Sequence, residues 1–301
     1  MRVVNNQLFL ELLRTKHFES GYLPESLHFT PDYILAQVDR QQIAADIYYW
    51  EKKPVQNRPA VIFLHGGGFW SGDKKQFQRQ AAYLALQLNV FAVSLYYRFS
   101  GGAPFPAALQ DVKCAVRWVR SISSAYHIDP ARIILIGGSP GGNLAALAGV
   151  TNGVEAYEGT GGFADFSSDI NGAIIFNGVF DFISYIETAE DEKDHVRQYL
   201  GGSLADFPEQ YVEASPLLRV WQNAVPMLLL HGREDAVIPH EKSVQMHQKL
   251  QEKGISSEIA IFDGKGHGWF NRIPDGMDAL QRVERFMVER FGCRNRVRIS
   301  Q

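Results

Sequence analysis

Short apolar runs alternate with amphipathic stretches along most of this chain. The predicted strands after residue 60 are 60–64, 90–95, 132–136, 172–176, 226–230 and 257–262. Helical spacing of apolar positions predicts helices over 75–87, 106–126, 143–148, 240–253 and 279–291. Strands that alternate with helices in this way predict an α/β fold, in which a mostly parallel central sheet carries helices on both faces.

The N-terminal part has a different pattern. Residues 5–20 have helical spacing with one apolar face, and 33–38 and 41–50 alternate like two antiparallel strands. No proline- or serine-rich linker and no internal repeat divides the chain. We therefore expect a single domain over 1–301, with an N-terminal arm or lid over 1–30. The short helical pieces between proline breaks in 181–220 predict a small, partial cap.

Composition excludes several classes of partner. The 301 residues carry a formal net charge of -3, with 46% hydrophobic and 21% charged residues, as in an ordinary globular enzyme. Without a long charge run, nucleic acid and acidic membrane surfaces are not expected as partners. Two distant cysteines make no disulfide framework.

The expected location follows from two missing sequence signals. The first residues lack a charged start followed by an apolar stretch, and no apolar run approaches the roughly 18 residues of a membrane-spanning helix. These observations favour a cytoplasmic protein, although a mature secreted protein would have the same pattern. Monomer and homodimer both remain open.

The residues around Ser139 form the most informative local pattern. Residues 137–142 read Gly-Gly-Ser-Pro-Gly-Gly, after an apolar strand and before a predicted helix. This strand, Gly-x-Ser-x-Gly and helix order predicts a nucleophile elbow, a sharp turn that holds the serine hydroxyl clear of the sheet. Pro140 is unusual, because the residue after the nucleophile normally donates a backbone N–H to the oxyanion and proline has none.

An acid and a histidine follow later strands in the order expected for partners of Ser139. The strand 226–230 leads to Asp235, and the strand 257–262 leads to His267 in a glycine-rich loop. Both lie just past the carboxyl ends of strands, where open α/β sheets place their sites. The pattern alone leaves Glu234 and Asp263 as rival acids.

A glycine run after the strand 60–64 predicts the site that would bind the oxyanion. Its glycines Gly67 and Gly68 can point backbone N–H groups at a substrate oxygen, because no side chain stands in the way. A third N–H of the same loop is a further candidate. We expect His65 to be structural, holding this loop through its ring.

Other candidates have less support from the sequence. Phe69, Trp70 and Trp269 are candidate substrate-binding residues, and Tyr96 and Phe180 are possible pocket aromatics, although such residues are as often core. Arg98 and Asp111 are expected to form a structural ion pair. No Cys or His spacing matches a metal site, and the glycine patterns fit neither a phosphate loop nor a dinucleotide fingerprint. No cofactor is therefore predicted.

Taken together, these motifs resemble α/β-hydrolases of the carboxylesterase type related to hormone-sensitive lipase. The resemblance covers about residues 30–290 and is strongest to the feruloyl and acetyl-xylan esterase branch, called BD-FAE. The matching residues are His65-Gly66-Gly67-Gly68-Phe69-Trp70, Tyr97-Arg98, Pro104-Phe105-Pro106-Ala107-Ala108, Asp111-Val112-Lys113, Ile128-Asp129-Pro130 with Arg132-Ile133, the serine motif, Ala214-Ser215-Pro216, His231-Gly232 with Asp235, and Gly266-His267-Gly268.

The resemblance implies a function and one departure from the family. It implies an α/β-hydrolase fold with Ser139 as nucleophile, His267 as base and Asp235 as the acid. It also implies a carboxylesterase that cleaves small-molecule esters through an acyl-enzyme. The family usually has alanine where this chain has Pro140. The alternatives are a peptidase or amidase on the same fold and, because of Pro140, a binding protein without catalysis.

Overall fold

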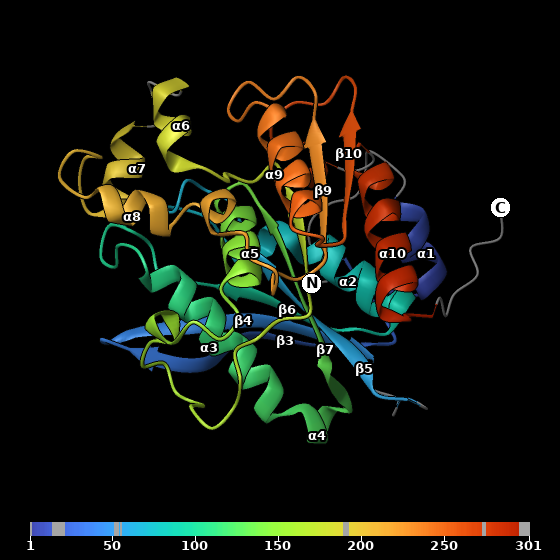
Figure 1. Cartoon of the computed structure of the whole chain (residues 1–301). Helices are drawn as coiled ribbons and strands as arrows, with labels where there is room; N and C mark the ends of the chain where they lie inside the picture. Colours follow the sequence, from blue (N-terminus) through green and yellow to red (C-terminus); the bar gives the residue numbers. More distant parts are fainter. Residues whose placement is uncertain are drawn as a thin grey trace.

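An eight-stranded sheet runs through the computed structural model, which describes residues 2–13, 22–50, 54, 56–188, 193–272 and 275–294 (Figure 1). The strand order is β10-β9-β8-β7-β5-β6-β4-β3. The strands are β3 (Leu27–Val38), β4 (Gln41–Trp50), β5 (Arg58–Leu64), β6 (Phe91–Tyr96), β7 (Ile128–Gly138), β8 (Gly172–Phe176), β9 (Met227–Gly232) and β10 (Ser257–Phe262). Strand β4 is antiparallel to both of its neighbours, and the other pairs are parallel. The predicted mostly parallel sheet is confirmed.

Helices cover both faces of this sheet, because successive side chains of each strand point to opposite sides. In β5, Ile62 and Leu64 belong to one core cluster, and Val61 and Phe63 belong to the other. The first cluster includes residues of α3 (Ala107–Ser121), α5 (Pro140–Val150) and α9 (Glu241–Glu252). The second includes residues of α1 (Asn6–Leu12), α2 (Gln78–Leu88) and α10 (Met277–Phe291). Figure 1 shows these two layers on either side of the sheet.

The N-terminal segment packs on the second of these faces. Helix α1 follows β1 (Arg2–Val4), which pairs with β2 (Tyr22–Pro24), and it buries Phe9 and Leu10. Residues 14–20 of the helix predicted over 5–20 lie outside the described residues. The arm or lid over 1–30 therefore stays a prediction, and its described helix docks on the core.

The helix predicted over 106–126 is broken, and that part of the prediction is wrong. Helix α3 ends at Ser121, and a separate short helix, α4 (Ser123–Tyr126), follows Ile122. The Ser121 hydroxyl donates a 2.7 Å hydrogen bond to the Trp118 carbonyl, a local bond of the kind that competes with helix continuation. Near the start of α3, Asp111 makes the predicted buried ion pair with Arg98 at 2.8 Å.

Short helices occupy the region predicted as a partial cap. They are α6 (Phe182–Thr188), α7 (Lys193–Leu200), α8 (Pro208–Glu213) and the 3₁₀ turn Pro216–Arg219. Figure 1 shows α6 at the same end of the molecule as the arrowheads of β9 and β10. Side chains of this region therefore reach the end of the sheet at which parallel strands present functional residues.

Candidate active site

Ser139 lies on a strained turn between β7 and α5. Its φ of 57° and ψ of -120° are unusual for a residue that carries a side chain. The flanking glycines make the turn possible, because a Cβ on Gly137 would lie 2.0 Å from the Gly141 carbonyl oxygen. A Cβ on Gly141 would lie 2.1 Å from the Leu64 carbonyl oxygen. The local sequence thus forms the sharp strand-to-helix turn that was predicted.

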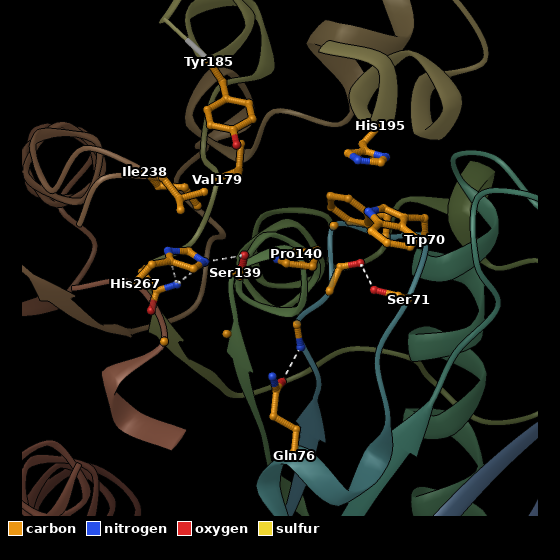
Figure 2. Close-up of a pocket in the computed structure, with 18 of the residues that line it drawn as sticks. Trp70, Ser71, Gln76, Ser139, Pro140, Val179, Tyr185, His195, Ile238 and His267 are labelled. Carbon is orange, nitrogen blue, oxygen red and sulfur yellow. Dashed lines mark hydrogen bonds between the residues drawn. The ribbon is translucent and has the colours of Figure 1, made fainter. Parts of the chain in front are cut away.

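Loops after β9 and β10 bring the predicted acid and histidine to Ser139. Figure 2 shows His267 beside Ser139. The Nε2 atom of His267 lies 3.1 Å from the Ser139 Oγ. On the other side of the ring, Nδ1 lies 2.8 Å from Oδ2 of Asp235. Since a carboxylate accepts, Nδ1 carries the proton and Nε2 is left to accept from the serine hydroxyl.

Asp235 is held as a buried carboxylate. Its side chain is 0% exposed, and Oδ1 accepts hydrogen bonds from the N–H groups of Val237 and Ile238, both at 2.9 Å. Burial alone would raise the pKa of Asp235. The hydrogen bonds from His231 and His267 and the charge on His267 outweigh burial and hold the pKa of Asp235 well below its ordinary value.

The rival acids point elsewhere. Asp263 is exposed and forms an ion pair with Arg233, and Glu234 is exposed on the same loop as Asp235. The interaction with His267 therefore falls to Asp235, whose side chain is buried, whereas that of Glu234 is exposed. Sequence spacing could not separate Glu234 from Asp235, which adjoin each other.

His231 is a further member of this network. In the sequence it is part of a family motif but had no predicted role. It is fully buried, and its Nε2 lies 3.2 Å from Asp235 Oδ2 and 2.9 Å from the Ile238 carbonyl oxygen. Its Nδ1 lies 2.7 Å from the Ser243 Oγ. A polar residue ending the apolar strand β9, four positions before Asp235, is the signal that could have revealed it.

The glycine loop after β5 lines the same cavity as Ser139 and has backbone N–H groups without a hydrogen-bond partner in the described chain. Gly67 and Gly68 have φ values of 122° and 63°, and both line the same cavity as Ser139. Within the part of the chain that the structure describes, no hydrogen bond uses the N–H of either glycine. The carbonyl of Gly67 accepts from Ser71 N at 3.0 Å, and Gly66 N donates to Gln76 at 2.5 Å, which fixes the loop.

His65 has the structural environment that was predicted for it. Its ring stacks on Tyr97 with centroids 4.2 Å apart, and Nδ1 donates to the Gly66 carbonyl at 2.9 Å. The Tyr97 hydroxyl donates to the His65 carbonyl at 2.7 Å. Burial lowers the pKa of His65 to about 4, so the ring is neutral near pH 7.

Pro140 is the first residue of α5. Proline suits this position, because its fixed φ fits the first helical turn and its missing N–H would have had no partner within the helix. The helix is therefore undisturbed, and the missing donor affects only the region beside Ser139. Pro140 lines the cavity together with the glycine loop.

The cavity beside Ser139 has a volume of about 350 Å³. It is lined mainly by apolar and aromatic side chains from the glycine loop, the cap helices and the loops after β9 and β10, including Phe69, Trp70, Phe182, Tyr185, Ile238 and Phe270. Figure 2 shows His195 of α7 next to Trp70, and the two rings stack with centroids 4.9 Å apart. The cap therefore contributes directly to the cavity wall.

Phe69 and Trp70 lie where the sequence predicted, whereas Trp269 does not. Trp269 is only 4% exposed, packs against Phe176 and Phe262, and is absent from the cavity lining. Its neighbour Phe270 lines the cavity instead, because successive residues of the 3₁₀ turn Trp269–Asn271 point in different directions. Phe180 is likewise a buried core residue, at 1% exposure.

The described ranges hold neither a metal-binding cluster nor a membrane-spanning helix. No cluster of His, Cys, Asp and Glu side chains there is arranged to hold a metal ion. None of the helices in those ranges combines the length and apolar character needed to cross a bilayer.

The known proteins that are similar in sequence to this chain include named ester hydrolases. The chain is 30% identical to the probable carboxylic ester hydrolase LipM of Mycobacterium tuberculosis over 67% of its length and 47% of the relative. It is 28% identical to esterase LipC of the same organism, over 73% of this chain and 56% of LipC. The chain thus spans about half the length of these curated relatives.

A solved structure matches nearly the whole fold. Esterase Est2 of Thermogutta terrifontis with bound propionate superimposes with a TM-score of 0.73 at 28% identity, covering 88% of this chain and 94% of Est2. The BD-FAE family model matches residues 45–250, more than half of the chain. The chain therefore belongs to the BD-FAE family and has the α/β-hydrolase fold.

Proposed function

We propose that this protein is a serine carboxylesterase that hydrolyses short-chain acyl or small aromatic-acid esters. The observation that carries the proposal is the continuous chain from Ser139 Oγ to His267 and on to buried Asp235, which opens into a mostly apolar cavity. The named esterases among its relatives support the same reaction class.

In the acylation step, His267 Nε2 takes the hydroxyl proton as Ser139 Oγ forms a bond to the ester carbonyl carbon. Asp235 keeps the proton of the ring on Nδ1 and stabilises the imidazolium. His267 then gives its proton to the leaving alcohol as the ester C–O bond breaks. An acyl group remains on Ser139.

Deacylation repeats these steps with water. His267 takes a proton from water as the water oxygen bonds to the acyl carbon, and the proton returns to Ser139 Oγ when the acid leaves. In both steps the carbonyl oxygen becomes negatively charged. The N–H groups of Gly67 and Gly68 are the donors we assign to it, since both residues line the cavity and neither N–H has a partner in the described chain.

The size of the cavity supports small acyl groups. A volume of about 350 Å³, partly closed by the cap helices, is at the low end of ordinary ligand pockets. Est2 has been solved with propionate and with butyrate, which is consistent with short acyl chains in this fold. The aromatic residues at the cavity wall, such as Trp70, favour flat or apolar groups on the substrate.

Hydrolysis of p-nitrophenyl esters tests the proposal. We expect turnover of the acetate and butyrate, weaker turnover of the octanoate, and a loss of at least about 10³-fold in Ser139→Ala. Ser167→Ala, an exposed serine outside the cavity, should leave the rate unchanged. A parent protein without turnover, or a Ser139→Ala variant as active as the parent, would support a non-catalytic binding protein instead.

A further inference from the structure

Asn177 is buried and lines the cavity. The steps of the proposed reaction described above do not use its side chain. Asn177 follows β8, is 0% exposed, and has a φ of 39°. Its backbone N–H donates to the Leu230 carbonyl at 2.9 Å, which ties it to the next strand. Asparagine tolerates this left-handed backbone better than most residues, and the conformation directs its side chain toward His267.

The amide of Asn177 lies over the face of the His267 ring. Its Nδ2 position is 3.2 Å from Nδ1 and 3.3 Å from Nε2 of that ring. In the ring plane, a point that close to both nitrogens would overlap the carbon between them. The amide therefore sits above the ring rather than at its edge.

The hydrogen bonds of His267 indicate whether the amide oxygen or the amide nitrogen of Asn177 lies over the ring. Nδ1 donates its proton to Asp235, and the lone pair of Nε2 is directed at Ser139 Oγ. The ring has no further lone pair to accept from an amide N–H. In addition, Oδ1 of Asn177 is buried and accepts no hydrogen bond from the described chain.

Which of the two amide positions of an asparagine holds the oxygen and which the nitrogen is decided by their hydrogen-bond partners. Here the partners favour the oxygen over the His267 ring. With the oxygen over the ring, the partial negative charge of the amide faces the imidazole. This charge stabilises the ring when it becomes an imidazolium. The nitrogen end would instead bring partial positive charge to the same place. Among the described groups, the charged or titratable neighbours of His267 are Asp235, hydrogen-bonded to it, and His231, which reaches the same Asp235 oxygen.

We propose that Asn177 is a positioning residue that presents its amide oxygen to the face of His267. It stabilises the imidazolium that forms in each transition state and keeps the ring aligned between Ser139 and Asp235. This inference rests on the proposed esterase function, because it concerns the base of that reaction. Asn177 thus joins Ser139, His267, Asp235 and His231 as a fifth group of this network.

Two substitutions separate this role from a structural one. Asn177→Gly removes the amide but keeps a residue suited to positive φ, and Asn177→Asp replaces the amide with a carboxylate. A matched control is Asn89→Gly, since Asn89 is also buried, at 7% exposure, with a φ of 54°. It lies at the end of α2 and is absent from the cavity lining.

The measurement is kcat/KM for p-nitrophenyl butyrate from pH 4.5 to 9, with the melting temperature of each variant. We expect Asn177→Gly to lose about tenfold in kcat/KM and to move the acid limb of the profile to lower pH by roughly half a unit or more. Asn177→Asp should move the limb to higher pH. Asn89→Gly should leave the profile in place.

Two results for Asn177→Gly would overturn the inference. An Asn177→Gly profile with an unmoved acid limb, whatever its melting temperature, would show a purely structural residue and overturn the inference. A shift to higher pH in that variant would show that the N–H end faces the ring, and would also overturn it. These results leave the esterase function intact, whereas a parent protein without Ser139-dependent turnover would overturn both proposals.

Discussion

The Nε2 atom of His231 lies 3.2 Å from Oδ2 of Asp235, the same oxygen that accepts the hydrogen bond of His267. Both neighbours of this Nε2 are acceptors, because the Ile238 carbonyl oxygen lies 2.9 Å away. Nε2 therefore carries the proton, and Nδ1 accepts from the Ser243 hydroxyl. A buried histidine thus holds the same carboxylate oxygen that binds the reacting ring.

Replacing His231 should weaken catalysis without touching the reacting atoms. His231→Leu removes one hydrogen bond from Asp235, and a bond to a charged group contributes about 1.5–3 kcal/mol. We expect kcat/KM for p-nitrophenyl butyrate to fall about tenfold to 100-fold. Ser243→Ala, which leaves the Nε2 bond in place, should have a smaller effect. Equal activity of His231→Leu and the parent would show that the backbone N–H groups alone orient Asp235.

Pro140 suggests a direct test of how the oxyanion is held. Pro140→Ala restores an N–H beside Ser139, and one such donor contributes about 2.7–4 kcal/mol in sites that depend on it. We expect kcat to rise by only about tenfold, because Gly67 and Gly68 are already assigned as donors to the same oxygen. Alanine is also accommodated in a first helical turn, so the fold should be unaffected. The measurement is kcat and KM for the acetate and butyrate esters. A flat or reduced kcat would indicate that Gly67 and Gly68 already provide enough donors.

His65 should make the stability of the fold depend on pH. Burial lowers its pKa from 6.5 to about 4, so the unfolded chain takes up a proton in this range while the folded state does not. Its contribution is therefore complete above pH 6.5 and is lost as the pH falls toward 4, by roughly 3 kcal/mol in all. Urea unfolding between pH 4 and 8 measures this dependence.

The matched variants for this measurement are His65→Gln and His240→Gln. His65→Gln should be less stable at pH 7, because it loses the stacking on Tyr97, and its stability should change less between pH 6.5 and 4. His240→Gln, outside the glycine loop, should keep the slope of the parent. A slope that is unchanged in His65→Gln would contradict the neutral, buried state of this ring.

The sequence predicted the parts of the site that follow strands directly. Ser139, Asp235 and His267 come within a few residues of a strand end, and the parallel strands carry them to one edge of the sheet. Gly67 and Gly68 were predictable for the same reason. Their roles needed only local patterns, since glycines and strand ends are visible in the sequence.

Other residues could not be predicted because packing decides them. Like Ser139, Asn177 directly follows a strand. Only the three-dimensional structure shows that its amide lies against the ring of His267, which is 90 residues away in the sequence. The choice between Trp269 and Phe270 depends on which way a single short turn faces. The break between α3 and α4 depends on a side-chain hydrogen bond within an otherwise regular apolar pattern.

In the proposed reaction, Ser139 is a nucleophile that His267 activates. The most direct measurement is the mass of the intact protein after treatment with a fluorophosphonate, followed by peptide mapping. We predict one adduct per chain, on Ser139, formed in the parent and in Ser167→Ala, absent in Ser139→Ala, and at least about 10³-fold slower in His267→Ala. A parent protein that stays unlabelled, or an adduct on another residue, would contradict the account.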